Sequence, residues 1–246
     1  MARGRGRVYV VGIGPGDPSL RTQASVDAIR ESSTVIGYTF YLDLVRDLLG
    51  GKSVVEYGMG EEVKRVQRAI ELAQSGEVVS LISGGDPQVF GIAALFYEYM
   101  ARNGIDVEVY TVPGVTAALA AASKLGSPLS SDFAVINLSD LLVSRDEIAL
   151  KVDSAARGDF VIVFYNPAKL DVVRMAMGIV ARYRSEHTPV GIARNVYRRG
   201  EKIIITTLGM WQNYSGYIDM RTTIIVGSSK TFTYRSYMVT PRGYRL

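Results

Sequence analysis

Short apolar runs alternate with longer amphipathic stretches through the first half of the chain. The runs are rich in β-branched residues, which is typical of buried parallel strands, and the stretches between them carry apolar residues at helical spacing. We expect strands at residues 7–12, 34–38, 54–57, 77–82 and 107–112, and helices at 19–31, 61–75, 89–103 and 117–124. Strands that alternate with helices predict a parallel sheet with helices on both faces.

The second half repeats the alternation after a stretch rich in Gly, Ser and Pro at 125–132, whose composition predicts a linker. The tail 234–246 is rich in Arg and Tyr, and we expect it to be frayed rather than to form an arm across a partner subunit. We expect strands at residues 133–138, 160–165, 190–196, 202–207 and 222–227, and helices at 145–156, 171–184 and near Trp211.

The composition of the chain excludes several kinds of disulfide and metal site. The chain of 246 residues contains no cysteine and a single histidine, His187, so disulfides, thiolate metal sites and multi-histidine metal sites are excluded. We therefore expect no bound metal. No apolar run approaches the roughly 20 residues of a membrane span, and the run behind the basic first residues is too short for a signal peptide. We expect a soluble, cytoplasmic protein with no membrane partner.

The charge balance is the next indication of a partner. The net charge of +4 permits an anionic partner such as a nucleic acid, a phosphate or a polycarboxylate. A solvated, arginine-rich surface explains the same charge equally well. Charge alone therefore leaves the partner open.

Three glycine-containing turns follow predicted strands, at residues 12–17, 83–87 and 113–116. Ligands on parallel sheets bind beyond the carboxyl ends of the strands, and glycines let a backbone lie close to a ligand because no Cβ stands in the way. In the second turn, Asp86 suits a helix N-cap, so this turn can also serve packing alone. In the first, Asp17 either caps the following helix or touches substrate.

The first turn approaches a dinucleotide-binding motif without completing it. In the pattern G-x-G-x-x-G that starts at Gly12, Asp17 replaces the last glycine, and Pro15 removes a backbone donor that a pyrophosphate needs. The strand at 34–38 also lacks the acidic residue that binds the ribose. A nicotinamide oxidoreductase is therefore disfavoured.

The three turns, in this order and spacing, resemble the tetrapyrrole methylase family over essentially the whole chain. The segments that carry the resemblance are Val11-Gly12-Ile13-Gly14-Pro15-Gly16-Asp17-Pro18, Gly84-Gly85-Asp86-Pro87 and Val112-Pro113-Gly114-Val115-Thr116-Ala117. Two further segments look like the precorrin-3B or cobalt-factor III C17-methyltransferase subgroup, namely Asn137-Leu138-Ser139-Asp140-Leu141-Leu142 and Phe164-Tyr165-Asn166-Pro167. The chain departs from that subgroup at 143–145 and 168–171, which bears on its substrate contacts.

The resemblance implies an α/β fold of two αβα domains, with a mostly parallel N-terminal sheet, a mixed C-terminal sheet and a cleft between them. We place the domains at residues 1–115 and 116–246. It also implies a homodimer, and S-adenosylmethionine as a methyl donor that leaves as S-adenosylhomocysteine. Carried over residue by residue, it assigns the donor to Pro15, Gly84, Gly85, Asp86, Val89, Phe90, Thr116 and Ala117, and in the second domain to Tyr165, Asn195, Thr207 and Leu208.

Methyl transfer from a sulfonium needs alignment and a dry site, which suits a chain with one unpromising histidine. The implied substrate is an anionic tetrapyrrole of cobalamin biosynthesis, precorrin-3B or cobalt-factor III, methylated at C17 with ring contraction. Asp17 is the candidate catalytic residue. Because arginines bind carboxylates bidentately, the substrate-binding candidates are Arg194, Arg198, Arg199 and Arg221.

Other functions fit parts of the pattern. An RNA 2′-O-methyltransferase of the same superfamily suits the positive charge. The segments at 137–142 and 164–167 argue against it, so we expect no nucleic-acid partner. A different precorrin methyltransferase keeps the chemistry and changes the position that is methylated. A non-catalytic binding subunit is disfavoured because the glycine turns are retained.

Overall fold

The chain divides between Ala117 and Ala118 into two units in the computed structural model, which describes residues 6–245. The sequence-based boundary is at 115/116. Residues 1–5 of the basic N-terminal stretch and residue 246 of the tail lie outside the described residues.

The first unit is built on a five-stranded sheet in which every strand runs parallel to its neighbours. The strand order is β3-β2-β4-β1-β5, so that β1 lies between β4 and β5, the other two strands that are followed by glycine turns. The strands are β1 (Arg7–Gly12), β2 (Thr34–Tyr38), β3 (Ser53–Tyr57), β4 (Val78–Ser83) and β5 (Glu108–Val112). The predicted parallel sheet is confirmed.

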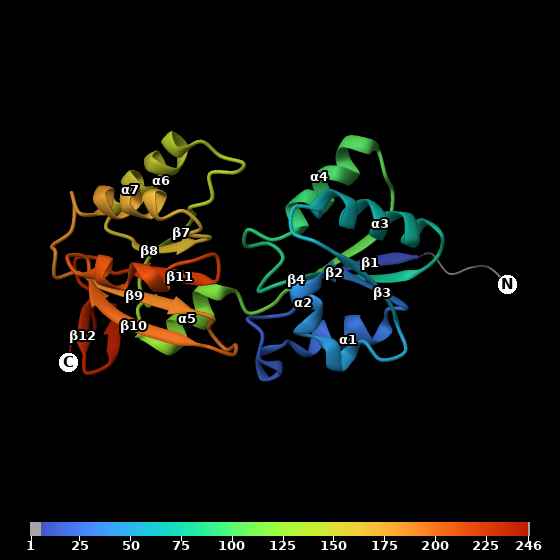
Figure 1. The fold of residues 1–246 in the computed structure, drawn as a ribbon, viewed down its shortest axis with the longest axis horizontal. Helices are drawn as coiled ribbons and strands as arrows, with labels where there is room; N and C mark the ends of the chain where they lie inside the picture. Colours follow the sequence, from blue (N-terminus) through green and yellow to red (C-terminus); the bar gives the residue numbers. More distant parts are fainter. Residues whose placement is uncertain (1–5, 246) are drawn as a thin grey trace. The chain divides into compact units, whose positions relative to one another are not determined.

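Helices cover both faces of this sheet (Figure 1). The helices α3 (Glu62–Gln74) and α4 (Ala93–Asn103) lie on one face, and α1 (Gln23–Glu31) and α2 (Thr39–Asp43) lie on the other. Each face has its own apolar core, because successive strand residues point to opposite sides: Val10 packs with α3 and α4, whereas Val11 packs with α1. Burying each such side chain contributes about 1.5–3 kcal/mol.

The second unit contains a mixed five-stranded sheet, as predicted. The order is β10-β9-β11-β8-β7, in which β7 and β8 are parallel and β11 runs antiparallel to β8 and β9. The strands are β7 (Phe133–Asn137), β8 (Val161–Tyr165), β9 (Pro189–Arg194), β10 (Lys202–Thr207) and β11 (Thr222–Val226). β8 is buried along its whole length, as expected of a central strand.

Helices again lie on both faces of this second sheet (Figure 1). The helices α6 (Arg145–Arg157) and α7 (Leu170–Val180) pack on one face, over an apolar core that contains Phe164 and is called here the larger core. The helix α5 (Ala117–Leu125) lies on the other face. The alanine-rich α5 approaches β9 closely: a Cβ at Gly191 would lie 2.4 Å from Cδ1 of Leu125. A 3-10 helix, Trp211–Tyr217, places the buried Trp211 in the larger core.

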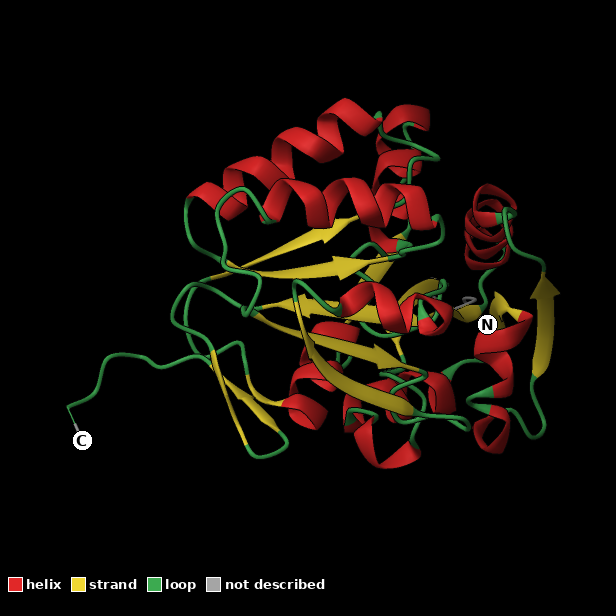
Figure 2. Cartoon of the chain, turned by 60° about the vertical axis from the view of Figure 1, so that its left-hand side comes forward, coloured by secondary structure: helices red, strands yellow, loops and turns green. Residues whose placement is uncertain are grey.

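The first part of the tail differs from its expected frayed state, whereas residues 241–245 are exposed and lie in no helix or strand. The strands β12 (Phe232–Tyr234) and β13 (Tyr237–Val239) form a hairpin, and β13 pairs with β6 (Gly126–Ser127), which lies in the predicted linker (Figure 2). The physical reason is burial: Met238 is fully buried, with its Sδ 3.0 Å from the position of a Cβ on Gly191. Thr240 is buried as well and its amide donates to the Ser127 carbonyl (3.1 Å), so two buried residues anchor this segment.

Three predicted helix boundaries are wrong. The first helix begins at Gln23 rather than near 19, because Thr22 is the N-cap and accepts a hydrogen bond from the Ser25 amide. The helix expected from 89 begins at Ala93. α7 ends at Val180 instead of 184. Among residues 6–245, no helix is long and apolar enough to cross a membrane.

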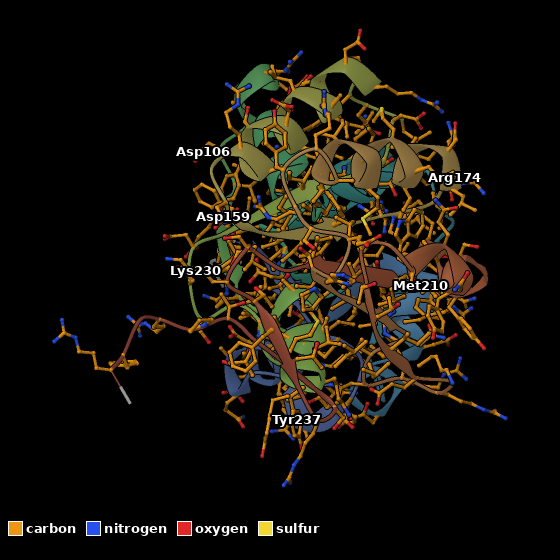
Figure 3. All side chains as sticks on the ribbon, turned by 90° about the vertical axis from the view of Figure 1, so that its left-hand side faces the viewer. Asp106, Asp159, Arg174, Met210, Lys230 and Tyr237 are labelled. Atoms are coloured by element: carbon orange, nitrogen blue, oxygen red, sulfur yellow. The ribbon has the colours of Figure 1, made fainter. Side chains whose placement is uncertain are left out.

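A buried arginine stabilises the end of the second sheet at which β8 begins. The guanidinium of Arg184 donates to the Ala156 carbonyl at the end of α6 (2.7 Å) and pairs with Asp159 (3.0 Å). Asp159 also accepts hydrogen bonds from the amide and hydroxyl of Ser229, and Figure 3 shows it near Lys230. Burial alone would raise the pKa of Asp159, but these partners lower it below its ordinary value.

Candidate functional site

The carboxyl ends of β1 and β4 form a topological switch point. These strands are adjacent and parallel, yet the chain leaves β1 for α1 on one face of the sheet and leaves β4 for α4 on the other (Figure 1). The turns that follow them therefore diverge and leave room beyond the strand ends, which is where open α/β sheets bind their ligands. Two of the three predicted glycine turns lie here, and the third follows the neighbouring β5.

Backbone hydrogen bonds fasten the first two turns to each other. The Ile13 amide donates to the Ser83 carbonyl (3.0 Å), and Gly14 and Gly85 exchange two hydrogen bonds (3.1 and 2.9 Å). Gly14 and Gly85 both have positive φ values, 73° and 65°, in which glycine is preferred. The Gly85 amide is already bonded to Gly14, so a ligand must use other groups of this turn.

The third turn packs against the first two with no room for side chains. A Cβ on Gly114 would lie 2.2 Å from the Gly85 carbonyl oxygen and 2.8 Å from the Gly12 backbone. A Cβ on Gly12 would lie 2.8 Å from the Gly114 amide nitrogen. These glycines are therefore required by the close approach of three backbones. The buried Ser25 hydroxyl of α1 adds a hydrogen bond to the Gly12 carbonyl (2.6 Å).

Asp86 joins the second turn to the third. One carboxylate oxygen accepts from the Gln88 amide (2.8 Å) and the other accepts from the Gly114 amide (3.0 Å). The expectation that Asp86 is the N-cap of the following helix is wrong, since α4 begins at Ala93 and Ile92 precedes it. Both carboxylate oxygens thus hold the loops of the switch point in place.

Gly84 serves a packing contact that the sequence does not reveal. A Cβ at this position would lie 2.6 Å from the ring of Tyr41, so the ring occupies the space beside the turn. Tyr41 belongs to a group of three half-buried aromatic side chains with Tyr38 and Phe40. The signal in the sequence is three aromatic residues among the four positions 38–41, where a predicted strand ends.

The other residues assigned to the donor in the first unit lie on these same turns. Phe90 has a φ of 52°, which is uncommon for an aromatic residue, and its side chain is 49% exposed. Val89 and Thr116 are half-buried, as is Ala117, whereas Pro15 is buried. An exposed ring on a strained backbone at a switch point is the arrangement expected of a ligand contact.

Asp17 caps the short 3-10 helix Pro18–Leu20. Its carboxylate accepts hydrogen bonds from the Ser19 amide (2.8 Å) and hydroxyl (2.7 Å), and the side chain is half-buried. It caps this turn rather than α1, whose N-cap is Thr22. These contacts account for an aspartate at this position without a catalytic role.

In the second unit, Tyr165 connects the end of β8 to the start of α5. Its hydroxyl accepts a hydrogen bond from the Ala118 amide (2.6 Å), which is one of the first amides of the helix and has no partner within it. The side chain is 8% exposed. The neighbouring Asn166 has a φ of 52° and donates to the Asn137 side chain (3.1 Å). The segments 137–142 and 164–167, called here the signature segments, are therefore joined at the ends of adjacent strands.

We expect Tyr165→Phe to lower the free energy of unfolding by about 1–3 kcal/mol, because the buried Ala118 amide loses its acceptor. Urea unfolding measures the loss. The matched control is Tyr110→Phe, whose hydroxyl contacts the exposed Glu108 and whose loss should stay within about 0.5 kcal/mol. Equal stabilities of the two variants would show that the Tyr165 hydroxyl has no structural role.

Asn195 and Tyr165 lie at one end of the second sheet, and Thr207 and Leu208 lie at the other. β8 and β9 both run antiparallel to β11, so their carboxyl ends lie at the same end of the sheet. Thr207 pairs with Pro189 at the start of β9, whereas Asn195 follows its end, about 20 Å away at ~3.3 Å per residue. Leu208 is buried in the larger core. The structure does not bring these four residues together.

The four candidate arginines lie near the carboxyl end of β9. Arg194 pairs with Asp219 (2.8 Å), and Arg221 contacts the same carboxylate at 3.3 Å. Burial alone would raise the pKa of Asp219, but the hydrogen bonds from these arginines lower it below its ordinary value. Arg198 and Arg199 belong to the turn between β9 and β10, where Arg199 is exposed. Sequence reasoning missed Asp219, which neutralises part of this positive charge.

A group of ion pairs lies at this same end of the second sheet, beyond the carboxyl ends of β7 and β8. Asp140 pairs with Lys169 (2.7 Å) and Arg145 (2.9 Å), and both hydrogen bonds hold its pKa below the ordinary value. These contacts fasten the loop after β7 to the loop after β8. Among residues 6–245, no group of three His, Asp or Glu side chains is arranged to hold a metal ion.

Comparison with known proteins gives consistent similarities. The family model of the tetrapyrrole (corrin/porphyrin) methylases matches residues 7–211. The chain is 41% identical over 240 residues to a probable cobalt-factor III C(17)-methyltransferase of Salmonella typhimurium, covering 96% of this chain and 99% of that protein. It is 44% identical over 243 residues to the cobalamin biosynthesis protein CbiHC of Archaeoglobus fulgidus, covering 98% of this chain and 53% of that protein. The chain thus spans about half the length of some curated relatives and nearly all of others.

Two solved structures are similar over most of the chain. The crystal structure of the methyltransferase CobJ has a TM-score of 0.89 and 31% identity, covering 96% of this chain and all of that one. A uroporphyrin-III C-methyltransferase from Thermus thermophilus, solved in complex with S-adenosyl homocysteine, has a TM-score of 0.70 and 26% identity. That match covers 90% of this chain and 97% of the other.

Proposed function

The chain belongs to the tetrapyrrole (corrin/porphyrin) methylases, and we propose that it methylates C17 of cobalt-factor III or precorrin-3B in cobalamin biosynthesis. The observation that carries this proposal is the 41% identity to the Salmonella relative, which extends over nearly the whole of both chains. The signature segments at 137–142 and 164–167, joined through Asn137 and Asn166, support the same substrate position.

S-adenosylmethionine supplies a methyl group that its sulfonium charge has already activated. The protein then has to bind, align and exclude water, which requires neither a metal nor a histidine. The loops at the switch point suit this task, because Asp86 and the interlocked glycines hold them in one arrangement. The donor does not have to pay for ordering them when it binds.

We assign the donor in the first unit chiefly to the turn Asp86–Phe90 and to Thr116. Phe90 and Val89 offer apolar surface for the adenosine, and Thr116 offers a hydroxyl. Gly84, Gly85, Pro15 and Ala117 shape these turns. In the second unit we retain Tyr165 and Asn195, which lie at the same end of the sheet. We leave out Thr207 and Leu208, which lie at the opposite end.

Substrate carboxylates are assigned to the arginines at the end of β9. Arg194 and Arg221 already share Asp219, whereas Arg199 is exposed on the turn between β9 and β10. We therefore expect Arg199 to contribute more to substrate affinity than Arg194 or Arg221. Asp17 is proposed as a substrate contact rather than an acid or base, because its carboxylate caps a turn. The family resemblance also supports a homodimer, which the molar mass in solution tests.

The function is tested by incubating the protein with methyl-labelled S-adenosylmethionine and cobalt-factor III, with precorrin-3B in a parallel reaction. We expect one labelled methyl group per tetrapyrrole by mass spectrometry, located at C17 by NMR, which also shows whether the ring has contracted. Total cellular RNA serves as the competing acceptor. Labelled RNA beside an unmodified tetrapyrrole, or a methyl group at another carbon, would overturn the proposal.

A further inference from the structure

Three aromatic side chains gather at the carboxyl end of β2, next to the switch point. Tyr38 is the last residue of β2, and the parallel register with β4 places it level with Ser83, where the Gly84–Asp86 turn begins. Tyr38 and Tyr41 are in edge contact, with ring centroids 5.4 Å apart. Phe40 lies 6.2 Å from Tyr38 and 6.0 Å from Tyr41. All three residues are half-buried, so each keeps part of its surface accessible to solvent.

The fold holds this aromatic group in place from two sides. The ring of Tyr41 fills the space that a side chain at position 84 would take, so a glycine of the ligand-binding turn is required to seat it. The segment that follows is held by Arg21, whose buried guanidinium donates to the Leu44 carbonyl and to Asp47. α2 itself packs against β2, β3 and β4. The rings are therefore fixed beside the turn before any ligand arrives.

We propose that Tyr38, Phe40 and Tyr41 form a stacking surface that positions the tetrapyrrole macrocycle, an inference that rests on the proposed function. Aromatic rings supply much of the apolar contact area at binding surfaces, and three adjacent rings suit a ligand larger than a single purine. The macrocycle is the larger and more extended conjugated ring system of the two ligands. Its carboxylates reach outward to cations, and its apolar face needs a surface of this kind.

The test uses Phe40→Leu and Tyr38→Leu, which keep apolar volume and remove an aromatic ring. Cobalt-factor III is titrated into each variant without donor and followed by its visible absorbance, and S-adenosylhomocysteine is titrated separately by calorimetry. We expect the tetrapyrrole Kd to rise about threefold to tenfold for each variant, the size of one aromatic pair. The S-adenosylhomocysteine Kd should stay within about twofold of wild type. In turnover, KM should rise more than kcat falls.

Two controls separate stacking from folding. Phe40→Tyr retains a ring and should bind the tetrapyrrole like wild type. Tyr110→Leu removes a ring that stacks on Tyr9 in the body of the same sheet, and it should leave both affinities unchanged. Thermal unfolding identifies any variant that fails to fold. If one leucine variant does not fold, the tetrapyrrole Kd of the other one tests the stacking surface.

The outcomes distinguish this inference from the proposed function. A wild-type protein that neither binds nor methylates the tetrapyrrole overturns both. Normal methylation with an unchanged tetrapyrrole Kd in the leucine variants overturns the stacking surface alone. A rise in the S-adenosylhomocysteine Kd instead would assign the rings to the donor, which also contradicts the inference.

Discussion

Replacing Gly114 by alanine is expected to destabilise the first unit by about 3 kcal/mol or more and to abolish donor binding. The added Cβ would lie 2.2 Å from the Gly85 carbonyl oxygen and 2.8 Å from Gly12, and all of these neighbours are backbone atoms. Each of these backbone segments is fixed by the strand that it follows and cannot rotate away as a side-chain tip can. The three turns would have to separate, and the hydrogen bonds that join them would be lost.

Urea unfolding and calorimetric titration with S-adenosylhomocysteine measure the two effects of Gly114→Ala. The matched control is Gly178→Ala in α7, where the new methyl group meets nothing within 4 Å. Alanine there should stabilise the helix by up to about 1 kcal/mol, because glycine loses more backbone entropy on folding. A Gly114→Ala variant that keeps wild-type stability and donor affinity would show that the close approach of the three turns is not required.

Asp86→Ala is expected to weaken donor binding by about 30-fold, which corresponds to about 2 kcal/mol. The change removes the acceptors of the Gln88 and Gly114 amides, and hydrogen bonds to a charged group contribute about 1.5–3 kcal/mol each. The side chain is half-buried, so we expect a value near the lower end of that range. The loss should appear in stability and in donor affinity, because the same carboxylate holds both turns.

Asp86→Asn gives an intermediate test. The amide keeps one oxygen acceptor but turns an NH₂ group toward the other backbone amide, so one of the two hydrogen bonds is lost and two donors face each other. We expect its stability and its affinity for S-adenosylhomocysteine to fall between those of the wild type and Asp86→Ala. Donor affinity that is unchanged in both variants would remove Asp86 from the site and leave it a structural residue.

The periodicity of apolar residues was sufficient to predict the strands of both main sheets, because burial on a sheet constrains every position of a strand. It failed where a few tertiary contacts or a single backbone angle set the structure. The strand β13 depends on the burial of Met238 and Thr240, and the first turn of α4 is displaced to Ala93 by a φ of 52° at Phe90. The start of α1 was predicted wrongly for a similar reason. Asp17 and Thr22 both have side chains that can cap a helix, and in the structure it is Thr22 that caps α1.

The candidate site was predicted in part. The glycine turns and Asp86 were found because their order along the chain is distinctive, whereas their roles were not, since Gly12, Gly85 and Gly114 are far apart in sequence. Asp219 was missed because nothing in its neighbourhood shows that it pairs with Arg194. Thr207 was grouped with Asn195, although they lie at opposite ends of antiparallel strands.

The sequence by itself determined the α/β architecture, the ordered turns and the absence of cysteine chemistry, because each depends on residue type and local spacing. Only the tertiary structure decided what the residues of those turns do. Gly114 needs its missing side chain because two other backbones reach the same point, and Gly84 needs it because the Tyr41 ring does. Contacts between residues distant in sequence depend on the register and direction of whole strands, which local patterns do not contain.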